Sequence, residues 1–120
     1  MFEKNMKFPI LLDTYGTLLS ERKREILDYY YNEDYSLAEI SELTGISRQG
    51  VRDSVKKSEE ELFQLEDKLG LASKNERIAK AKLLLEKVVG CTSLDSDTKR
   101  LIDDVIAQLS DTPSAVKMEL

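Results

Sequence analysis

The chain has 120 residues, of which 18 are basic and 23 acidic, so its formal net charge is −5 at pH 7. This length suits one domain, or one domain with an appendage, and it is enough to bury a core without disulfides. The acidic balance argues against indiscriminate nucleic-acid binding, which depends on basic excess. With no histidine and Cys91 as the single cysteine, the composition excludes an internal disulfide, a zinc set and a histidine-based catalytic group. We expect Cys91 to be a semi-buried, unreactive thiol.

The apolar N-terminal segment predicts a helix of the domain rather than a membrane segment. The run of residues 8–19 is too short to span a bilayer, contains Asp13 and lacks a signal-peptide cleavage pattern. We therefore expect a cytoplasmic protein with no membrane anchor. Pro9 suits the first turn of a helix. Apolar residues at helical spacing predict that this helix covers residues 10–19, with Gly16 inside it.

A second helix is predicted over residues 21–31, with Ser20 as its N-cap. The side chains expected to face inward are Ile26, Leu27 and Tyr30. The three consecutive tyrosines at 29–31 allow two interpretations: stacking on nucleic-acid bases, or packing of at least two rings against the neighbouring helices. Helical spacing favours packing. Residues 32–35 are predicted to form a polar loop.

Residues 36–57 have the pattern of two helices joined by a tight turn. Ser36 and Glu39 have the spacing of a capping box at the start of the first helix. Gly45 can adopt the left-handed conformation that ends this helix, and Ile46 fills the turn. The apolar face of the first helix is predicted to consist of Leu37, Ile40 and Leu43. This order of helix, glycine turn and capped helix is typical of a helix-turn-helix motif.

The second helix of the motif begins after Ser47, and its outer side is basic. Val51 and Val55 are expected to face the core, while Arg48, Arg52 and Lys56 recur every four residues on the opposite face. Such a face suits the major groove, since arginine can bind guanine, and glutamine adenine, through paired hydrogen bonds. A solvated basic helix face is the alternative reading. The candidate DNA-binding residues are Ser47, Arg48, Gln49, Arg52, Asp53, Lys56 and Lys57.

This helix is predicted to continue to Leu69, because nothing interrupts it before Gly70. Apolar residues recur along it at heptad spacing, although Ser58 weakens the pattern. Its second half is expected to pack on the first helix of the chain or on a partner chain. Charge changes along it: residues 36–58 carry four basic and three acidic groups, net +1, whereas residues 59–72 carry one basic and five acidic groups, net −4. DNA contact would therefore be local, and the acidic triplet at 59–61 is read as a solvated face.

Two further helices are predicted towards the C-terminus. Ser73 and Glu76 form a second capping-box pattern for a helix that ends at Gly90. A last helix follows residues 94–97, and residues 111–120 are expected to form a frayed tail. Asp95 and Asp97 lie in the segment before the last helix, but the glycine and the glutamate of a calcium loop are absent there. No metal or other cofactor is therefore expected. We predict a domain over residues 1–72 and a C-terminal helical extension over residues 73–120.

The run LSERKREILDYYYNEDYSLAEISELTGISRQGVRDSVKKSEEEL resembles region 4 of sigma-70-type transcription factors. It resembles more narrowly the YlxM family of helix-turn-helix proteins, through the segments EDYSLAEI, GISRQ and EDKLGL. The resemblance covers about residues 10–72. It implies that Arg48, Gln49 and Arg52 occupy the recognition-helix positions with which sigma factors read promoter DNA. Family members are encoded beside genes of the signal recognition particle, which implies a regulatory role in that pathway.

This sequence departs from the pattern of those families at three positions. Gly50 replaces an alanine or larger residue, which loosens the helix by up to about 1 kcal/mol. Asp53 brings an acidic group towards the phosphates, although its carboxylate could accept a hydrogen bond from cytosine. Thr44 takes a helix-end position that is usually apolar. These departures weaken the case for tight DNA binding and leave the fold prediction unchanged.

The sequence predicts an all-α protein with five or six helices, in a sigma region-4-like arrangement with a long recognition helix. No phosphate-binding loop, nucleophile–base set or metal motif is present, so an enzyme is not expected. Two functions remain open. One is a DNA-binding regulator. The other is a protein- or RNA-interaction module of the signal recognition particle system that keeps the fold without reading DNA. A homodimer is expected, through residues 59–71 or through the C-terminal helices.

Overall fold

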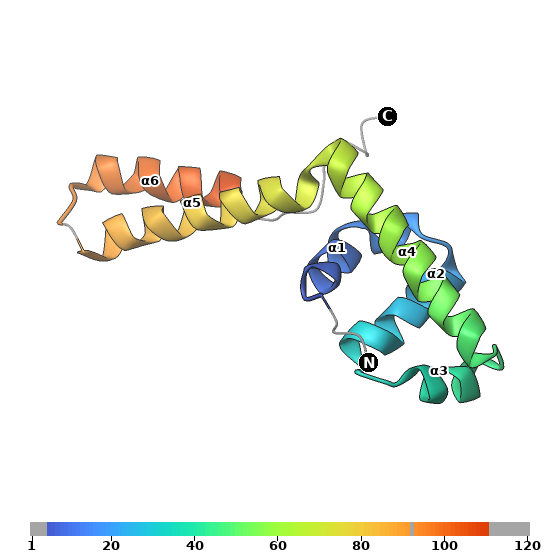
Figure 1. Ribbon diagram of the computed structural model, residues 1–120. Coiled ribbons are helices and arrows are strands. Elements are labelled where there is room, and N and C mark those ends of the chain that lie inside the picture. Colours follow the sequence, from blue (N-terminus) through green and yellow to red (C-terminus); the bar gives the residue numbers. More distant parts are fainter. Residues whose placement is uncertain (1–4, 92, 111–120) are drawn as a thin grey trace. The chain divides into compact units, whose positions relative to one another are not determined.

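The computed structural model describes residues 5–91 and 93–110. The elements in chain order are α1 (Lys7–Tyr15), η1 (Gly16–Leu18), α2 (Glu21–Leu27), η2 (Asp28–Asn32), α3 (Leu37–Thr44), α4 (Arg48–Leu69), α5 (Leu71–Cys91) and α6 (Ser96–Leu109) (Figure 1). No strand occurs within these ranges. The prediction of an all-α helix-turn-helix protein is therefore confirmed. A search of the described helices finds none with the length and apolar character needed to cross a membrane. The predicted tail at 111–120 lies outside the described residues.

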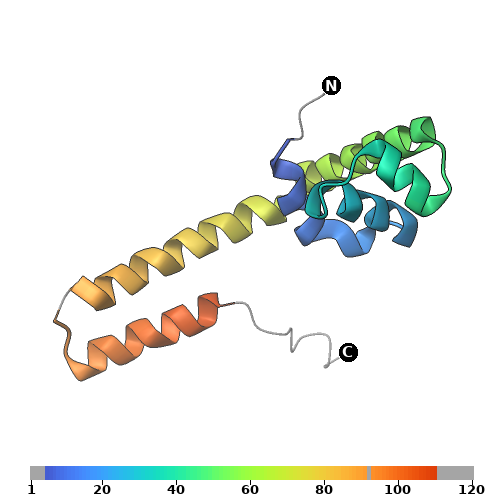
Figure 2. The same ribbon diagram turned by 90° about the horizontal axis from the view of Figure 1, so that it is seen from below.

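The chain divides into two compact units after Ser73. The first unit contains α1 to α4 and the first turn of α5, and the second contains the rest of α5 together with α6. In the first unit α4 packs against α1, α2 and α3 of its own chain (Figure 2). The expectation that the second half of this helix packs back on the first helix is thus confirmed, and no partner chain is needed to cover it.

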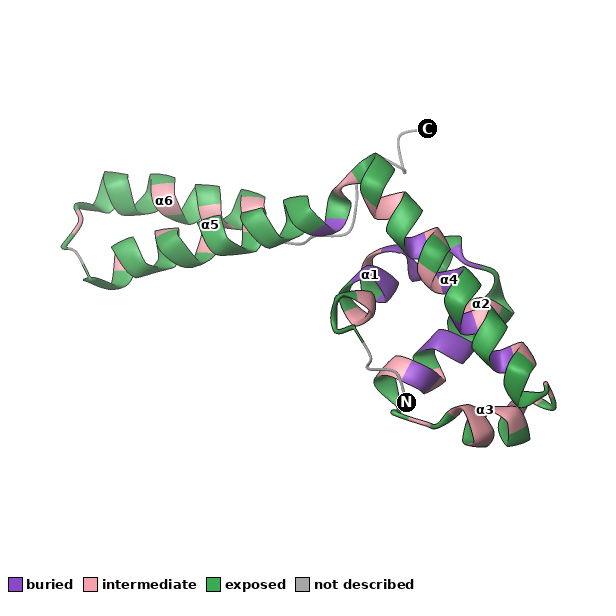
Figure 3. Ribbon diagram, viewed as in Figure 1, coloured by how far each residue is buried: buried purple, intermediate pink, exposed green. Residues whose placement is uncertain are grey.

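The buried core lies entirely in the first unit (Figure 3). Its members come from every helix of that unit and are Leu11, Leu12, Tyr15, Leu19, Ile26, Leu27, Tyr30, Ile40, Val51, Val55, Leu62 and Ala72. The inward positions predicted for the second helix are confirmed, because Ile26, Leu27 and Tyr30 are all buried. The three short helices α1, α2 and α3 thus pack against α4 and enclose this core.

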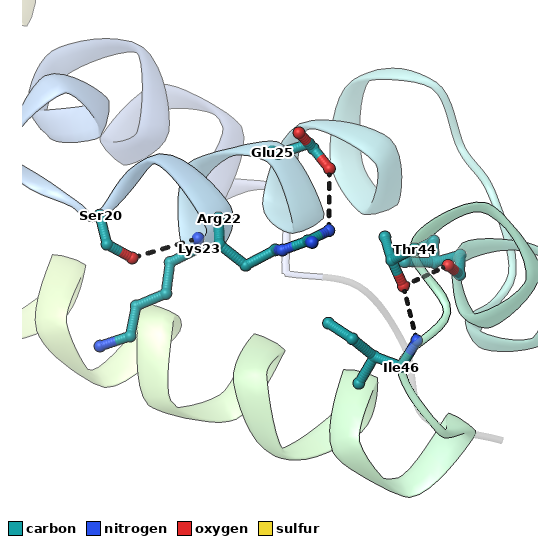
Figure 4. Close-up of polar contacts among 7 residues, drawn as sticks. Ser20, Arg22, Lys23, Glu25, Thr44 and Ile46 are labelled. Atoms are coloured by element: carbon teal, nitrogen blue, oxygen red, sulfur yellow. Dashed lines mark hydrogen bonds and ion pairs between the residues drawn. The ribbon is translucent and has the colours of Figure 1, made fainter.

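The first helix is shorter than the sequence predicts. The α-helix ends at Tyr15, and Gly16 begins a single 3-10 turn that ends at Leu18. Leu19 then has an extended backbone and is itself buried. The apolar spacing that suggested a helix to residue 19 reflects this burial, which is reached through a tight turn. The extended segment also leaves Ser20 free to cap α2, where its hydroxyl accepts a hydrogen bond from the Lys23 N–H at 3.3 Å (Figure 4).

The tyrosine run at 29–31 packs inside the unit. After Leu27 the chain continues as one π-helical turn, η2, instead of the α-helix predicted to residue 31. Tyr30 is buried and meets Tyr31 edge-on, with ring centroids 5.0 Å apart. Tyr29 stacks on Tyr35, with centroids 5.6 Å apart. The packing interpretation is confirmed, and the wider turn brings all three rings towards neighbours.

The acidic triplet at 59–61 is more than a solvated face. The Tyr31 hydroxyl donates a hydrogen bond to Glu59, and Lys23 forms an ion pair with Glu61. Burial, followed by this bond to a carboxylate, raises the pKa of Tyr31 far above its usual range. Two of the three carboxylates therefore tie α4 to η2 and α2. The sequence cannot show this, because each partner lies about thirty residues or more away along the chain.

The start of α5 also differs from the prediction. Ser73 is not its N-cap, since α5 already begins at Leu71. Glu66 takes over the capping: its two carboxylate oxygens accept hydrogen bonds from the backbone N–H groups of Ala72 and Ser73, at 3.0 and 3.1 Å. The Tyr15 hydroxyl donates to Glu66 at 2.6 Å and accepts from the Leu71 N–H at 3.0 Å. A carboxylate at a helix N-terminus satisfies these N–H groups and opposes the positive end of the helix dipole.

The second unit is an antiparallel pair of helices (Figure 1). Asp95 caps α6 through a hydrogen bond from the Thr98 N–H at 2.7 Å. Gly90 lies within the last turn of α5, so the prediction that it ends this helix is wrong. Cys91 is exposed, contrary to the expected semi-buried thiol. From Lys74 onwards no described residue is buried, and the α5–α6 pair therefore lacks a closed core.

Candidate nucleic-acid interface

The first helix of the motif, α3, begins and ends where the sequence predicts. The Ser36 hydroxyl accepts from the Glu39 N–H, and the Glu39 carboxylate accepts from the Ser36 N–H, both at 3.1 Å. This is the predicted capping box. At the other end Gly45 has φ +76°, the left-handed conformation that glycine adopts without strain. Both ends of α3 are therefore fixed by local chemistry.

The turn between α3 and α4 is held by two hydroxyls. The Thr44 hydroxyl donates to the Ile40 carbonyl at 2.8 Å and accepts from the Ile46 N–H at 3.3 Å (Figure 4). The Ser41 hydroxyl donates to the Ile46 carbonyl at 2.5 Å. Ile46 therefore has both backbone polar groups satisfied while its side chain packs against the core. Threonine at position 44, which departs from the resembled families, here stabilises the turn.

Gly50 allows the turn to lie close to α4. The Ser47 hydroxyl caps α4 by accepting from the Gly50 N–H at 3.0 Å. A Cβ at position 50 would lie 2.7 Å from Cγ2 of Ile46 and 3.1 Å from the Ser47 hydroxyl oxygen. An alanine there would require the Ile46 side chain to shift. Glycine at position 50 lowers helix propensity, but it allows the turn to approach the recognition helix closely.

The buried contacts of the motif fix which side of α4 faces outwards. Ile40, Val51 and Val55 are almost completely buried. The prediction for Leu43 is wrong, because 59% of its surface is exposed. It lies in the last turn of α3, where the chain turns away from the core towards Gly45. The apolar face of α3 is thus reduced to Ile40 and the half-buried Leu37, and the inward side of α4 supplies the remaining contacts.

All seven candidate DNA-binding residues are exposed on the N-terminal half of α4 or at its cap. Among the described residues, Arg48, Lys56 and Lys57 have no hydrogen-bond or ion-pair partner. Gln49 donates to Asp53 through its side-chain amide, at 3.0 Å. This bond occupies one oxygen of the Asp53 carboxylate and leaves its negative charge in place. It must also rearrange before Gln49 can present its amide to a base edge.

Arg52 has a second role that the sequence pattern did not reveal. The charge of Arg52 lowers the pKa of Tyr30, although burial and the nearby Glu59 raise it more, so that the pKa of Tyr30 stays above its ordinary value. Arg52 is therefore close to the tyrosine cluster at the base of η2. Arg52 is nevertheless exposed, as Arg48 is. The proximity of Arg52 to Tyr30 depends on the tertiary contact between α4 and η2, which the local sequence pattern does not predict.

Another surface of the first unit is acidic. A cleft with a volume of about 830 Å³ is lined by α1, η1, α2 and η2. Its charged lining residues are Asp13, Glu21, Arg24, Glu25 and Asp28, a net charge of −3. A phosphate backbone is repelled from such a surface. This cleft is therefore a poorer surface for DNA than the first half of α4, where Arg48, Arg52, Lys56 and Lys57 are exposed.

The amino-acid sequence matches a known protein family. Residues 2–105 match the family model UPF0122, described as "Putative helix-turn-helix protein, YlxM / p13 like". The chain belongs to this family. A UPF0122 protein of Clostridium novyi is 40% identical over 106 residues, which cover 86% of this chain and 92% of the relative. One from Caldanaerobacter subterraneus is 48% identical over 82 residues, 68% of each chain. One from a Thermoanaerobacter strain is 37% identical over 105 residues, 85% of this chain and 90% of the relative.

Proposed function

We propose that this protein is a DNA-binding regulator that places the first half of α4 in the major groove. The observation that carries the proposal is the division of α4 into two sides. Val51 and Val55 are buried, while Arg48 and Arg52 lie one turn apart on the exposed side. A helix held at its cap and supported by a second helix can enter a groove without reordering. Membership of a family described as helix-turn-helix supports the same function.

The roles within the face follow from side-chain chemistry. Arg48 is the principal base contact, because its guanidinium is exposed and has no partner among the described residues. Arg52 and Gln49 add contacts after giving up those they make in the free protein. Lys56 and Lys57 bind phosphate, since an ammonium group acts as a point charge. Asp53 accepts from cytosine or limits the sequences that bind. Ser47, whose hydroxyl caps α4, positions the helix.

The wider biological setting is also part of this proposal. The resemblance to sigma region 4 supports a role in transcription regulation, and the family resemblance supports a role in the signal recognition particle pathway. The proposal includes a cytoplasmic homodimer that reads two half-sites. A role as a regulator rather than an enzyme is supported by the packing of α1, α2 and α3 on α4, which leaves the basic face of α4 exposed.

The test is duplex binding by wild type and three variants at two salt concentrations. Arg48→Ala should weaken binding to the preferred sequence by about 1–3 kcal/mol and relax selection at one position. Arg52→Ala should have a similar or smaller effect. Lys56→Ala should weaken binding to all sequences alike and make the salt slope shallower by about one. Genomic fragments selected by the protein would supply the duplex.

The alternative function predicts a different result in the same experiment. A protein- or RNA-interaction module would have little duplex affinity at physiological salt, and Arg48→Ala would change its binding to protein or RNA instead. If wild type and the Arg48→Ala, Arg52→Ala double variant bind genomic fragments equally poorly, the DNA-binding proposal is wrong. A lysine outside both proposed interfaces, the exposed Lys68 in the last turn of α4, supplies the matched control: Lys68→Ala should leave base selection unchanged.

A further inference from the structure

The α5–α6 hairpin of the second unit has two apolar stripes on each helix. The inner stripe is half-buried where the two helices face each other, and consists of Ile78, Leu85 and Val89 on α5 and Ile102, Ile106 and Leu109 on α6. The outer stripe is exposed and consists of Ala81, Leu84 and Val88 on α5 and Leu101 and Val105 on α6. Leu84 exposes 63% of its surface to solvent, and Leu101 exposes 66%. The inner stripe explains the hairpin, and the outer stripe has no partner among the residues of the second unit that the structure describes.

The outer stripes of both helices lie on the same side of the hairpin. At about 100° per residue, the outer stripe on each helix is rotated by roughly 90–100° from the inner one, in the same sense along the chain. The two helices run in opposite directions (Figures 1 and 2). Equal rotations along opposite directions bring both outer stripes to one face. This continuous apolar surface, Ala81, Leu84, Val88, Leu101 and Val105, is called the outer face below.

A face of this geometry is what a four-helix bundle requires. In such a bundle every helix contacts two neighbours at roughly right angles around its axis, so each helix needs an apolar surface wider than one stripe. A two-helix hairpin supplies half of the bundle. We propose that the outer face binds the outer face of a second copy of this chain, forming an antiparallel four-helix bundle. This inference takes up the homodimer of the proposed function and assigns its interface, while the geometric argument depends on the hairpin alone.

Charge distribution supports a second copy and selects one arrangement. Residues 71–91 carry five basic and two acidic groups, net +3, whereas residues 95–109 carry two basic and four acidic groups, net −2. By helical position, Lys80 and Lys87 flank the outer stripe of α5, and Asp97 and Asp104 flank that of α6. A two-fold axis parallel to the helices places α5 of each copy on α6 of the other. Opposite charges then meet at both edges, whereas α5 on α5 would bring like charges together.

In the other interface considered from the sequence, residues 59–71, the inward positions are already used within the chain, while Phe63 and Leu69 are 62% and 51% exposed. Leu62 is completely buried, and Leu65 packs against the same core. Glu59 and Glu61 bind Tyr31 and Lys23 of their own unit. Removing these contacts to form a dimer would expose the core of the first unit. The outer face of the hairpin needs no such rearrangement.

The chain offers a closely matched pair of variants as a test. Leu83 and Leu84 are adjacent on α5 and equally exposed, at 63% each, but only Leu84 lies on the outer face. Leu84→Glu would bury a carboxylate in the apolar interface and should raise the dimer dissociation constant by at least about thirtyfold. Leu83→Glu should leave it unchanged. Sedimentation equilibrium of the full chain at micromolar concentration measures both. A wild-type mass of one chain, or equal dissociation of the two variants, would overturn the proposal.

Charge reversal tests the arrangement within the bundle. Lys80→Glu with Lys87→Glu should weaken the dimer, and adding Asp97→Lys with Asp104→Lys should restore it, because each altered edge then meets an oppositely charged edge again. Failure of the second pair to restore the dimer would contradict α5-on-α6 pairing. Helix content from far-ultraviolet circular dichroism, to which both units contribute, shows whether the hairpin of each variant is folded. If the wild-type protein has the mass of two chains but does not bind duplex DNA, that result would count against the DNA-binding proposal. It would not count against this interface.

Discussion

The two units of the chain use the same helical amphipathicity in opposite ways. In the first unit, every core residue contacts partners supplied by the same chain, and α4 is enclosed by three shorter helices. In the second unit, the described parts of α5 and α6 contain equally apolar stripes but no buried residue. Amphipathic spacing therefore predicts that a helix has a buried face, but not which molecule covers it. The first unit is complete by itself, and the second is suited to assembly.

The largest expected effect comes from matched leucine truncations in the two units. Leu62→Ala removes a completely buried side chain and should lower the unfolding free energy of the first unit by about 2–5 kcal/mol. Leu85→Ala in the hairpin should change it by less than about 0.5 kcal/mol. Tyrosine fluorescence during urea unfolding measures this unit alone, because all five tyrosines lie between residues 15 and 35 and the chain has no tryptophan. Equal shifts for the two variants would mean that the units unfold together.

A smaller and opposite effect is expected at the one buried hydroxyl that lacks a partner among the described residues. Ser58 is completely buried on α4, and its oxygen forms no hydrogen bond there. Ser58→Ala should raise the unfolding free energy by about 1–2 kcal/mol, since an unsatisfied buried polar group is removed. Ser54→Ala, a half-buried serine on the same helix, controls for helix propensity and should gain no more than about 0.5 kcal/mol. Equal gains would show that the Ser58 hydroxyl carries no penalty.

The smallest effect concerns the carboxylate that caps α5. The hydrogen bond from Tyr15 and those from two backbone N–H groups hold the pKa of Glu66 below its ordinary value of 4.5. A lowered pKa stabilises the fold above pH 4.5, and this contribution is lost as pH falls through the folded-state pKa. Glu66→Gln should therefore cost about 0.3–1 kcal/mol at pH 7. The difference from wild type should disappear as the pH falls through the folded-state pKa of Glu66. A difference that is independent of pH would rule out the charge as its cause.

Local chemistry made much of the first unit predictable. Ser20, Ser36 and Ser47 are N-caps as expected, and Gly45 and Gly70 end their helices in the left-handed conformation. The length of α4 and the burial of Val51 and Val55 also follow from the sequence. Each of these features depends on residues within one or two helical turns, so the pattern contains the whole cause. The exposure of the candidate DNA-binding face follows for the same reason, because it lies opposite those valines.

Other features depend on partners distant in sequence, and only the tertiary structure decided them. Tyr15 and Glu66 form the cap of α5 across 51 residues, which no local pattern at Ser73 could reveal. Packing also decides three further features. They are the early end of α1 at Tyr15, the π turn that packs the tyrosines, and the proximity of Arg52 to Tyr30. The sequence by itself determined where helices are capped and which stripes are apolar, because those causes are local. The structure decided which stripes are covered within the chain, because burial depends on what the rest of the fold brings alongside.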